Sequence, residues 1–359
     1  MSDSAANRRD FLTGRALASA AEAAGNQVAD ALVAMPHPGR GPTLLLRTSA
    51  MGTDFDVLLN PDGPSHQVGA ASEALDEIVR LDEQYSVYRA ESELSTLNRL
   101  AAEHRVEVEQ QLFRLLRRGC ALAQQTEGAF NPIAGQLIEL WRRTRREERA
   151  PTESERRQAI EAARLDRVEF DDARSAVRFS APGPRFDLGA IGKGYAVDRA
   201  AEILVEQGVE NWLVHGGKSS ARVRGCHVEH DGWPIALQNP LLPDRRFLTL
   251  ILRDMAMSTS GTAVQWYRHQ GKRYGHILDP RTGWPVEVML SVSVIAPDAA
   301  LADALSTAFF VLGVEKALSY CDNFENVGVI LFPLPDDGRT LAPIIRGVPQ
   351  DRLYFADPA

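Results

Sequence analysis

Residues 186–195, with the sequence FDLGAIGKGY, constrain the fold more than any other part of the chain. Gly189, Gly192 and Gly194 lie where an extended segment enters a helix. Because glycine has no Cβ, the backbone N–H groups of such a segment can approach a ligand closely. A helix N-terminus favours phosphate, and Lys193 adds a full positive charge. The spacing matches neither G-x-x-x-x-G-K-[ST] nor G-x-G-x-x-G, and a tight turn with a packing glycine is the alternative to a phosphate site.

Composition excludes several other classes of protein. The chain has 359 residues, of which 44% are hydrophobic and 25% charged, as in one large globular domain or two small ones. The net charge of −8 does not favour nucleic-acid binding, and no apolar run reaches the roughly 20 residues of a membrane span. Three cysteines without metal-ligand spacing predict buried free thiols and neither a disulfide framework nor a zinc site.

Residues 1–42 predict a tail and a linker that ends in a run of prolines and glycines. Residues 7–12 resemble a twin-arginine export signal, but Arg15 and Glu22 interrupt the apolar segment that should follow, and no cleavage site is evident. Export to a periplasmic, membrane-associated location and a cytoplasmic location therefore both stay open. Residues 43–355 are expected to form a single domain.

Strand and helix patterns alternate irregularly along residues 43–355, which predicts an α+β fold. Strands are expected at 43–60 with a turn at 51–53, and at 167–169, 176–179, 212–215, 220–224, 234–237, 248–252, 274–278, 290–295 and 328–332. Helices are expected at 68–79, 110–126, 135–146, 152–165, 193–207, 301–312 and 314–321. The helix at 152–165 opens with a capping-box sequence.

Two further segments carry polar residues that suit a site. Residues 214–220 end a strand with paired glycines, Lys218 and two hydroxyls, which could hold a polar ligand or form a hairpin turn. The hydroxyl-rich residues 258–261 are followed along the chain by His276 and Asp279 beside a turn. A histidine and a carboxylate can act as a base and its orienting group or as neighbours of a metal, whereas a structural histidine is the alternative.

Asp303 and Thr307 are four residues apart near a helix start and therefore share one helix face. A carboxylate and a hydroxyl oxygen on one face suit Mg²⁺, which keeps several waters and often bridges substrate phosphates. The alternative is an acidic residue favoured near a helix N-terminus by the helix dipole.

In their order along the chain, these motifs resemble those of the FAD:protein FMN transferases, the ApbE-type flavin transferases. The likeness runs from about Thr48 to Leu312. Besides the segments above, it rests on Met51-Gly52-Thr53, on Tyr85-Ser86-Val87-Tyr88 leading to Ser92-Glu93-Leu94-Ser95 and Asn98, and on residues 126–141 with Gly128-Ala129-Phe130-Asn131-Pro132.

The resemblance implies a T-fold-related body of antiparallel sheets with packed helices, and a flavin cleft between two sub-regions. It implies an enzyme that, with Mg²⁺, transfers FMN from FAD to a Ser or Thr hydroxyl of an acceptor protein through a phosphoester bond and releases AMP. An FAD pyrophosphatase that yields FMN and AMP is one alternative. A non-catalytic protein that binds or stores FAD is the other.

The resemblance also implies roles for individual residues. The metal would be held by the Ala190 carbonyl and the side chains of Asp303 and Thr307. His276 is the first choice for the base and Asp279 the second, with Lys193 on the phosphates. The expected FAD-binding residues are Met51, Tyr88, Ala129, Phe130, Asn131, Asp187, Lys193, Gly217 and Ile277.

Two positions depart from the family pattern. Asn131 stands where the family usually has Asp, and Lys218 stands where it usually has Asp or Asn. The first departure changes a residue expected near the flavin or its ribose, and the second changes the charge near the pocket. Both motivate the non-catalytic alternative.

Overall fold

The computed structural model describes residues 42–356 except 229, 262–265, 270–271 and 336–340. The tail and the twin-arginine-like segment expected in residues 1–41 lie outside this range. Within it, no helix combines the length and the apolar character needed to cross a bilayer.

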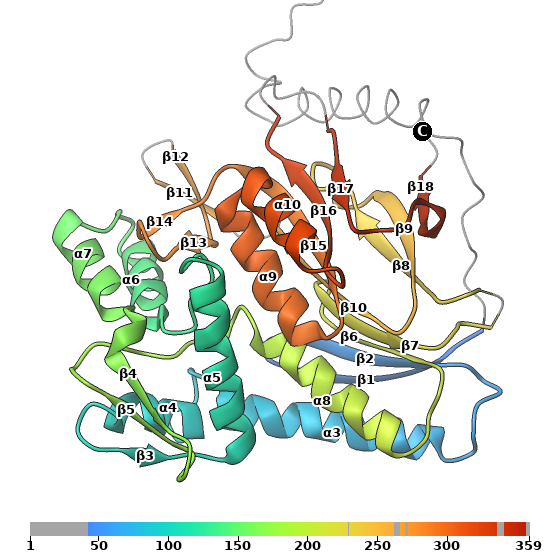
Figure 1. Ribbon diagram of the computed structural model, residues 1–359, viewed down its shortest axis with the longest axis horizontal. Coiled ribbons are helices and arrows are strands. Elements are labelled where there is room, and N and C mark those ends of the chain that lie inside the picture. The colour runs from blue at the N-terminus through green and yellow to red at the C-terminus, as the bar shows by residue number, and fades with distance from the viewer. Residues whose placement is uncertain (1–41, 229, 262–265, 270–271, 336–340, 357–359) are drawn as a thin grey trace, which may run out of the picture.

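An eight-stranded sheet in which every neighbouring pair is antiparallel forms the centre of the molecule (Figure 1). Its order is β1-β2-β6-β7-β10-β15-β16-β17. The strands are β1 (Leu44–Ala50), β2 (Thr53–Leu59), β6 (Trp212–Gly216), β7 (Ser220–Arg224), β10 (Ala256–Gly261), β15 (Met289–Ala296), β16 (Gly328–Pro333) and β17 (Ile344–Arg346).

Both faces of this sheet are covered, which explains the near-continuous apolar sequence of its inner strand β16. Helices α3 (Gln67–Tyr85), α8 (Gly192–Glu206), α9 (Ala299–Leu312) and α10 (Val314–Asn323) pack on one face (Figure 1). A three-stranded sheet of β8 (Trp233–Gln238), β9 (Arg246–Leu252) and β18 (Leu353–Phe355) covers the other. Because successive strand residues point to opposite faces, Val294 joins the core under the helices, whereas its neighbour Ile295 joins the core between the sheets.

A second, mainly helical sub-region lies beside the sheet (Figure 1). It contains α4 (Glu93–Leu100), α5 (Gln110–Gln125), α6 (Gly135–Arg146), α7 (Glu153–Ala162) and a small sheet of β3 (Val106–Glu107), β4 (Val168–Asp171) and β5 (Ala176–Phe179), with a 3₁₀ turn at Leu165–Arg167. Two hairpins follow later in the chain, β11–β12 (Trp266–His269 and Lys272–Gly275) and β13–β14 (Leu278–Asp279 and Trp284–Pro285). Residues 180–191 link the two sub-regions and lead into α8.

The expected α+β class is confirmed, and most elements lie where the sequence predicts them. Thr152 and Glu155 form the capping box of α7. Met51 and Gly52 have φ of 51° and 72° between the paired residues Ala50 and Thr53, as in a type I′ hairpin turn.

The single strand expected at 274–278 is wrong, because the chain bends at His276 between β12 and β13. The sequence does not predict helix α4 or strand β10. The polar residues 258–261 lack the apolar alternation that normally indicates a strand, and their pairing with β7 and β15 is a long-range feature.

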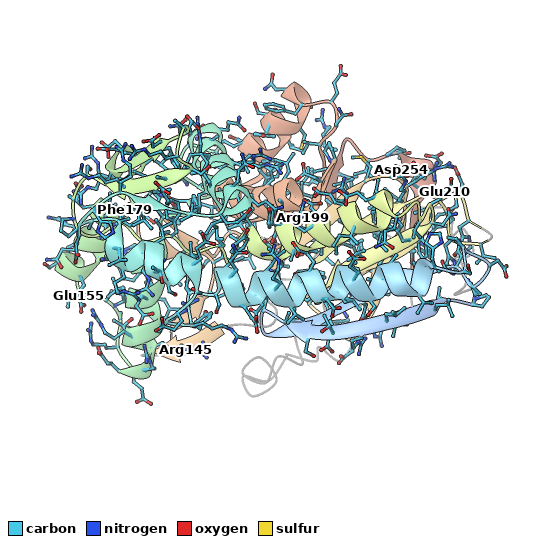
Figure 2. All side chains as sticks on the ribbon, turned by 90° about the horizontal axis from the view of Figure 1, so that it is seen from below. Arg145, Glu155, Phe179, Arg199, Glu210 and Asp254 are labelled. Atoms are coloured by element: carbon cyan, nitrogen blue, oxygen red, sulfur yellow. The ribbon has the colours of Figure 1, made fainter. Side chains whose placement is uncertain are left out.

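Helices α8 and α9 touch backbone to backbone at Gly194. A Cβ built on Gly194 would overlap the carbonyl group of Ala299, the first residue of α9, and would lie 2.5 Å from its carbon. Real Cβ atoms do not come this close, so only glycine permits the contact. Figure 2 shows the layer that contains α8, with Arg199 labelled on it. The start of α9 is therefore fixed against the glycine-rich segment that the sequence singles out.

We expect Gly194→Ala to lower the free energy of unfolding by about 3 kcal/mol, because the methyl group must push α9 away from α8. Gly69 in α3 is the matched control, since a Cβ there meets nothing within 4 Å. Gly69→Ala should raise the unfolding free energy by about 0.5–1 kcal/mol. Urea unfolding followed by circular dichroism measures both changes. Equal stability of the two variants would contradict the close contact.

Candidate functional site

Asp303 is the point where α8, α9 and β10 meet. The whole residue is only 4% exposed. Oδ2 accepts a hydrogen bond from the Gly194 N–H at 3.1 Å and lies 3.8 Å from Lys193 Nζ. Oδ1 accepts a hydrogen bond from Ser258 Oγ at 3.1 Å. The structure therefore brings the glycine-flanked Lys193 segment and the predicted metal-binding carboxylate into contact.

Thr307 lies one turn further along α9. Its Oγ1 is 3.2 Å from Ser260 Oγ. Ser258 and Ser260 are alternate residues of β10 and point to the same face of the strand, the face that packs on α9. Asp303 and Thr307 are thus both held by this one pair of serines.

The donor set at this junction suits a hard divalent cation. Asp303 offers carboxylate oxygens and Thr307 a hydroxyl oxygen, and oxygen is the ligand atom that Mg²⁺ prefers. Ala190, whose carbonyl is the third predicted ligand, precedes the first residue of α8 by two positions in the chain. Across the part of the chain that the structure describes, no group of three or more His, Cys, Asp or Glu residues could hold a metal. A cation with one carboxylate ligand would keep waters or take oxygens from a substrate, which matches the behaviour of Mg²⁺ at phosphates.

Asp198 of α8 holds the start of α9 in place. Its two oxygens accept hydrogen bonds from the N–H groups of Ala299 and Ala300, each at 2.8 Å, and Arg222 donates to it at 2.8 Å. Burial raises the pKa of Asp198 to about 6, against the lowering effects of Arg222 and the two amides. Such contacts satisfy N–H groups that a helix start leaves without partners. The sequence does not predict this role, because the carboxylate that caps α9 belongs to another helix.

Tyr88 and Asp187, two predicted FAD-binding residues, are joined by Arg142. Tyr88 is 76% exposed, and the Arg142 guanidinium carbon lies 4.9 Å from its ring centroid. Arg142 Nη1 is also 3.7 Å from Asp187 Oδ2. Residues 141–149 are rich in arginine, as on a solvated helix face, so the sequence alone does not single out Arg142 among them. Its contacts come from distant parts of the chain.

Residues 129–132 lie beside Asp187, whose N–H donates to the Pro132 carbonyl at 2.8 Å. Ala129 and Phe130 are buried, so little of their side chains is exposed to a ligand. Asn131 Nδ2 donates to the Ala163 carbonyl at 2.8 Å, and its Oδ1 accepts from the Ile133 N–H at 2.9 Å. A carboxylate could not donate the first of these bonds. Asn131, where the family usually has Asp, therefore adds a hydrogen bond to Ala163 within the helical sub-region.

Two hairpin turns bring Met51 and Gly217 into one neighbourhood. The Gly217 N–H donates to the Asp54 carbonyl at 2.7 Å, and a Cβ on Gly217 would lie 2.8 Å from Thr53 Oγ1. Gly217 has a φ of 59°, which also favours glycine. Lys218, the second departure, is exposed in the turn between β6 and β7.

His276 and Asp279 differ in their surroundings. Both Asp279 oxygens accept hydrogen bonds from the Arg281 guanidinium at 2.9 Å, and this bonding raises the pKa of Arg281. His276 is exposed in the bend between β12 and β13. Ile277 beside it is buried, and its carbonyl accepts from the Val286 N–H. Asp279 is therefore ion-paired with Arg281, and the contacts of its side chain do not connect it to Asp303.

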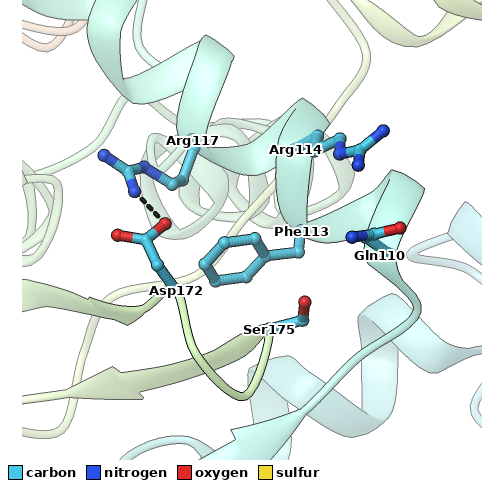
Figure 3. A pocket seen from close by; sticks show the side chains of 6 residues that line it. All are labelled: Gln110, Phe113, Arg114, Arg117, Asp172 and Ser175. Carbon is cyan, nitrogen blue, oxygen red and sulfur yellow. Dashed lines mark hydrogen bonds and ion pairs between the residues drawn. The ribbon is translucent and has the colours of Figure 1, made fainter.

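A shallow groove of about 310 Å³ lies elsewhere, on the helical sub-region between α5 and the β4–β5 turn (Figure 3). It is lined by Gln110, Phe113, Arg114, Arg117, Asp172 and Ser175. None of these is a predicted site residue, and Arg117 and Asp172 form an ion pair across it.

Comparison with known proteins gives consistent matches over most of the chain. A family model described as the ApbE family matches residues 51–331. The chain is 33% identical to an FAD:protein FMN transferase of Klebsiella pneumoniae over 81% of this chain and 89% of that protein. It is 30% identical to the FAD:protein FMN transferase of Haemophilus influenzae over 82% of this chain and 87% of that protein.

Solved structures are similar as well. The crystal structure of the ApbE protein from Thermotoga maritima has a TM-score of 0.75 and 30% identity, covering 85% of this chain and 97% of that one. The flavin transferase ApbE from Vibrio cholerae has a TM-score of 0.71 and 25% identity over the same shares.

The raised pKa of Asp198 predicts how this residue affects stability with pH. Folding favours its protonated form, so its contribution to the unfolding free energy is fully present below about pH 4 and declines as pH rises through about 6. An asparagine side chain stays neutral at every pH, so the difference in unfolding free energy between wild type and Asp198→Asn should fall over this window and then level off. Urea unfolding between pH 4 and 7.5 measures it. A difference that grows with pH would contradict the prediction.

Proposed function

The chain belongs to the ApbE family, and we propose that this enzyme transfers the FMN half of FAD, with Mg²⁺ bound, to a Ser or Thr hydroxyl of an acceptor protein. The hydroxyl oxygen forms a phosphoester bond to the FMN phosphorus. The bond from that phosphorus to the bridging oxygen breaks, and AMP leaves. We further propose that residues 43–355 act as a single transferase domain.

The contact between Lys193 and Asp303 carries this proposal. A diphosphate is anionic, and the N-terminus of α8 with Lys193 Nζ offers it positive charge. Asp303 Oδ2 lies 3.8 Å from the same ammonium group. A phosphate bound by Lys193 would therefore lie close to the Asp303 carboxylate. A carboxylate beside an anionic substrate repels it unless a cation lies between them, which supports a metal at this point.

The residues proposed to hold Mg²⁺ are Asp303 and Thr307 through side-chain oxygens and Ala190 through its carbonyl. When bound, the ion would neutralise charge on the diphosphate and polarise the phosphorus. Lys193 would hold the phosphates, because catalysis of phosphoryl transfer depends mainly on positioning and electrostatics.

His276 is the proposed base, and an imidazole nitrogen would take the proton of the acceptor hydroxyl as that oxygen attacks. Asp279 is the weaker choice, because both its oxygens are engaged by Arg281. The exposure of His276 suits a residue that must meet a hydroxyl of another protein.

The flavin half is proposed to lie against Tyr88, with Asp187, Ile277, Met51 and the turn at Gly217 as further contacts. The residues at 129–131, Ala129, Phe130 and Asn131, complete the proposed pocket. An exposed tyrosine ring can stack on an isoalloxazine, and the Arg142 guanidinium now over that ring would move aside or pair with the flavin.

The proposal is tested by incubating the protein with FAD, Mg²⁺ and an acceptor domain, with and without EDTA. We expect a fluorescent covalent flavin band on the acceptor that EDTA abolishes. Asp303→Ala should lower the rate about 100-fold or more, because a ligand that contributes about two to three kcal/mol is removed. Asp322→Ala is the control, since Asp322 lies exposed on α10 and pairs with Arg346.

Different products identify the alternatives. Free FMN and AMP without labelled acceptor would indicate an FAD pyrophosphatase. FAD binding without turnover in wild type, unchanged in Asp303→Ala, would indicate a storage protein. Either result contradicts the proposed transfer.

We expect His276→Ala to lower kcat by about 10²- to 10⁴-fold with little change in FAD affinity, because the base acts in the chemical step. The acid limb of the pH–rate profile should disappear with it. Asp279→Ala should act mainly on thermal stability through the lost Arg281 pair. Rates and FAD binding are measured in parallel, and an unchanged pH profile in His276→Ala would exclude it as the base.

A further inference from the structure

Residues 258–261 stand out in the sequence, yet the proposed transfer gives them no role. They form the end of β10. The buried Ser258 and the half-buried Ser260 face α9, whereas Met257 points into the core between the two sheets. Each of these serines contacts one of the two side chains proposed to bind the metal. A carboxylate or carbonyl oxygen can only accept a hydrogen bond, so a serine beside one must donate its proton to it. This rule fixes the directions of the other hydrogen bonds around these serines.

Ser258 has one hydroxyl proton and two close partners. Asp303 Oδ1 lies 3.1 Å away, and a carboxylate oxygen accepts, so Ser258 donates to it. Ser220 Oγ lies 3.1 Å on the other side and must therefore donate to Ser258. Ser220 is the residue directly opposite on β7. The result is a one-way chain of hydrogen bonds from Ser220 through Ser258 to Asp303.

The same reasoning fixes the proton of Thr307. Ser306 Oγ donates to the Asp303 carbonyl at 2.9 Å, because a carbonyl only accepts. Ser260 Oγ, 2.8 Å from Ser306 Oγ, must then donate to Ser306. With its own proton used, Ser260 can only accept from Thr307 Oγ1 at 3.2 Å. Thr307 therefore turns its proton towards β10 and keeps both lone pairs for another partner.

We propose that Ser258 and Ser260 are positioning residues that present the oxygen lone pairs of Asp303 and Thr307 to a divalent cation. This inference rests on the proposed metal site. A hydroxyl ligand binds a cation through a lone pair and needs an acceptor for its proton, and Ser260 is that acceptor. Ser258 and the Gly194 N–H hold the two oxygens of Asp303 from opposite sides, which fixes the rotation of the carboxylate.

Groups that orient metal ligands typically change metal affinity about 10- to 100-fold when they are removed. Ser258→Ala leaves Asp303 Oδ1 without its donor in a buried position, and Ser260→Ala leaves the Thr307 proton without its acceptor. Both changes should raise the Kd for a divalent ion about tenfold or more. Ser260→Thr keeps a hydroxyl at the same position and should restore most of the affinity.

The test uses Mn²⁺ as the probe and the full chain with FAD. Free Mn²⁺ is measured by electron paramagnetic resonance during a titration. Ser293→Ala is the matched control, because Ser293 is as buried as Ser258. Its hydroxyl is hydrogen-bonded to Thr259 Oγ1 at 2.7 Å and not to Asp303 or Thr307. We expect Kd to rise in Ser258→Ala and Ser260→Ala and to stay within about twofold of wild type in Ser293→Ala.

Asp303→Ala separates failure of the inference from failure of the proposed site. Wild-type affinity in both serine variants, with binding lost in Asp303→Ala, would overturn the positioning role and leave the metal site intact. No Mn²⁺ binding by wild type would overturn both. Thermal unfolding checks that each variant folds. If Ser258→Ala does not fold, Ser260→Ala and Ser260→Thr decide the question, because Ser260 is only half-buried.

Discussion

The buried carboxylate of Asp303 is the constraint on which the site depends. A charge removed from water is tolerated only when hydrogen bonds and an opposite charge replace its hydration. Three elements meet at Asp303, which belongs to α9, and two of them compensate its charge: α8 provides the Gly194 N–H and the Lys193 ammonium group, and β10 provides the Ser258 hydroxyl. None of them can move without leaving a buried polar group without its partner. The fold therefore holds the Lys193 segment, which is proposed to bind phosphate, and the proposed metal ligand Asp303 at a fixed separation.

The wider architecture serves the same arrangement. The central sheet is covered on both faces, so β10 packs on both sides. Met257 packs against the second sheet, whereas Ser258 and Ser260 face α9. Gly194 lets α9 touch α8, and Asp198 closes the start of α9. The ring of Tyr88, which is proposed to cover the flavin, is by contrast exposed, and exposure suits a surface that must accept a substrate and then release it.

Much of this was predictable from the sequence, because the signals were local. Helical periodicity located α5 and α6, and the capping sequence at Thr152 located the start of α7. The glycine spacing before α8 and the i, i+4 pair on α9 singled out two segments, and the fold brings these segments into contact. What the sequence could not reveal depends on tertiary contacts: β10 as a strand, the bend at His276, the cap that Asp198 supplies to another helix, and the place of Arg142 between Tyr88 and Asp187.

Anomalous diffraction from crystals grown with FAD and Mn²⁺ tests the central claim most directly. An anomalous peak should lie within about 2.0–2.4 Å of oxygens from Asp303, Thr307 and the Ala190 carbonyl, and within the same distance of a diphosphate oxygen. A well-ordered diphosphate with the ion bound elsewhere, or with no ion beside Asp303, would contradict the account of how this enzyme holds its substrate.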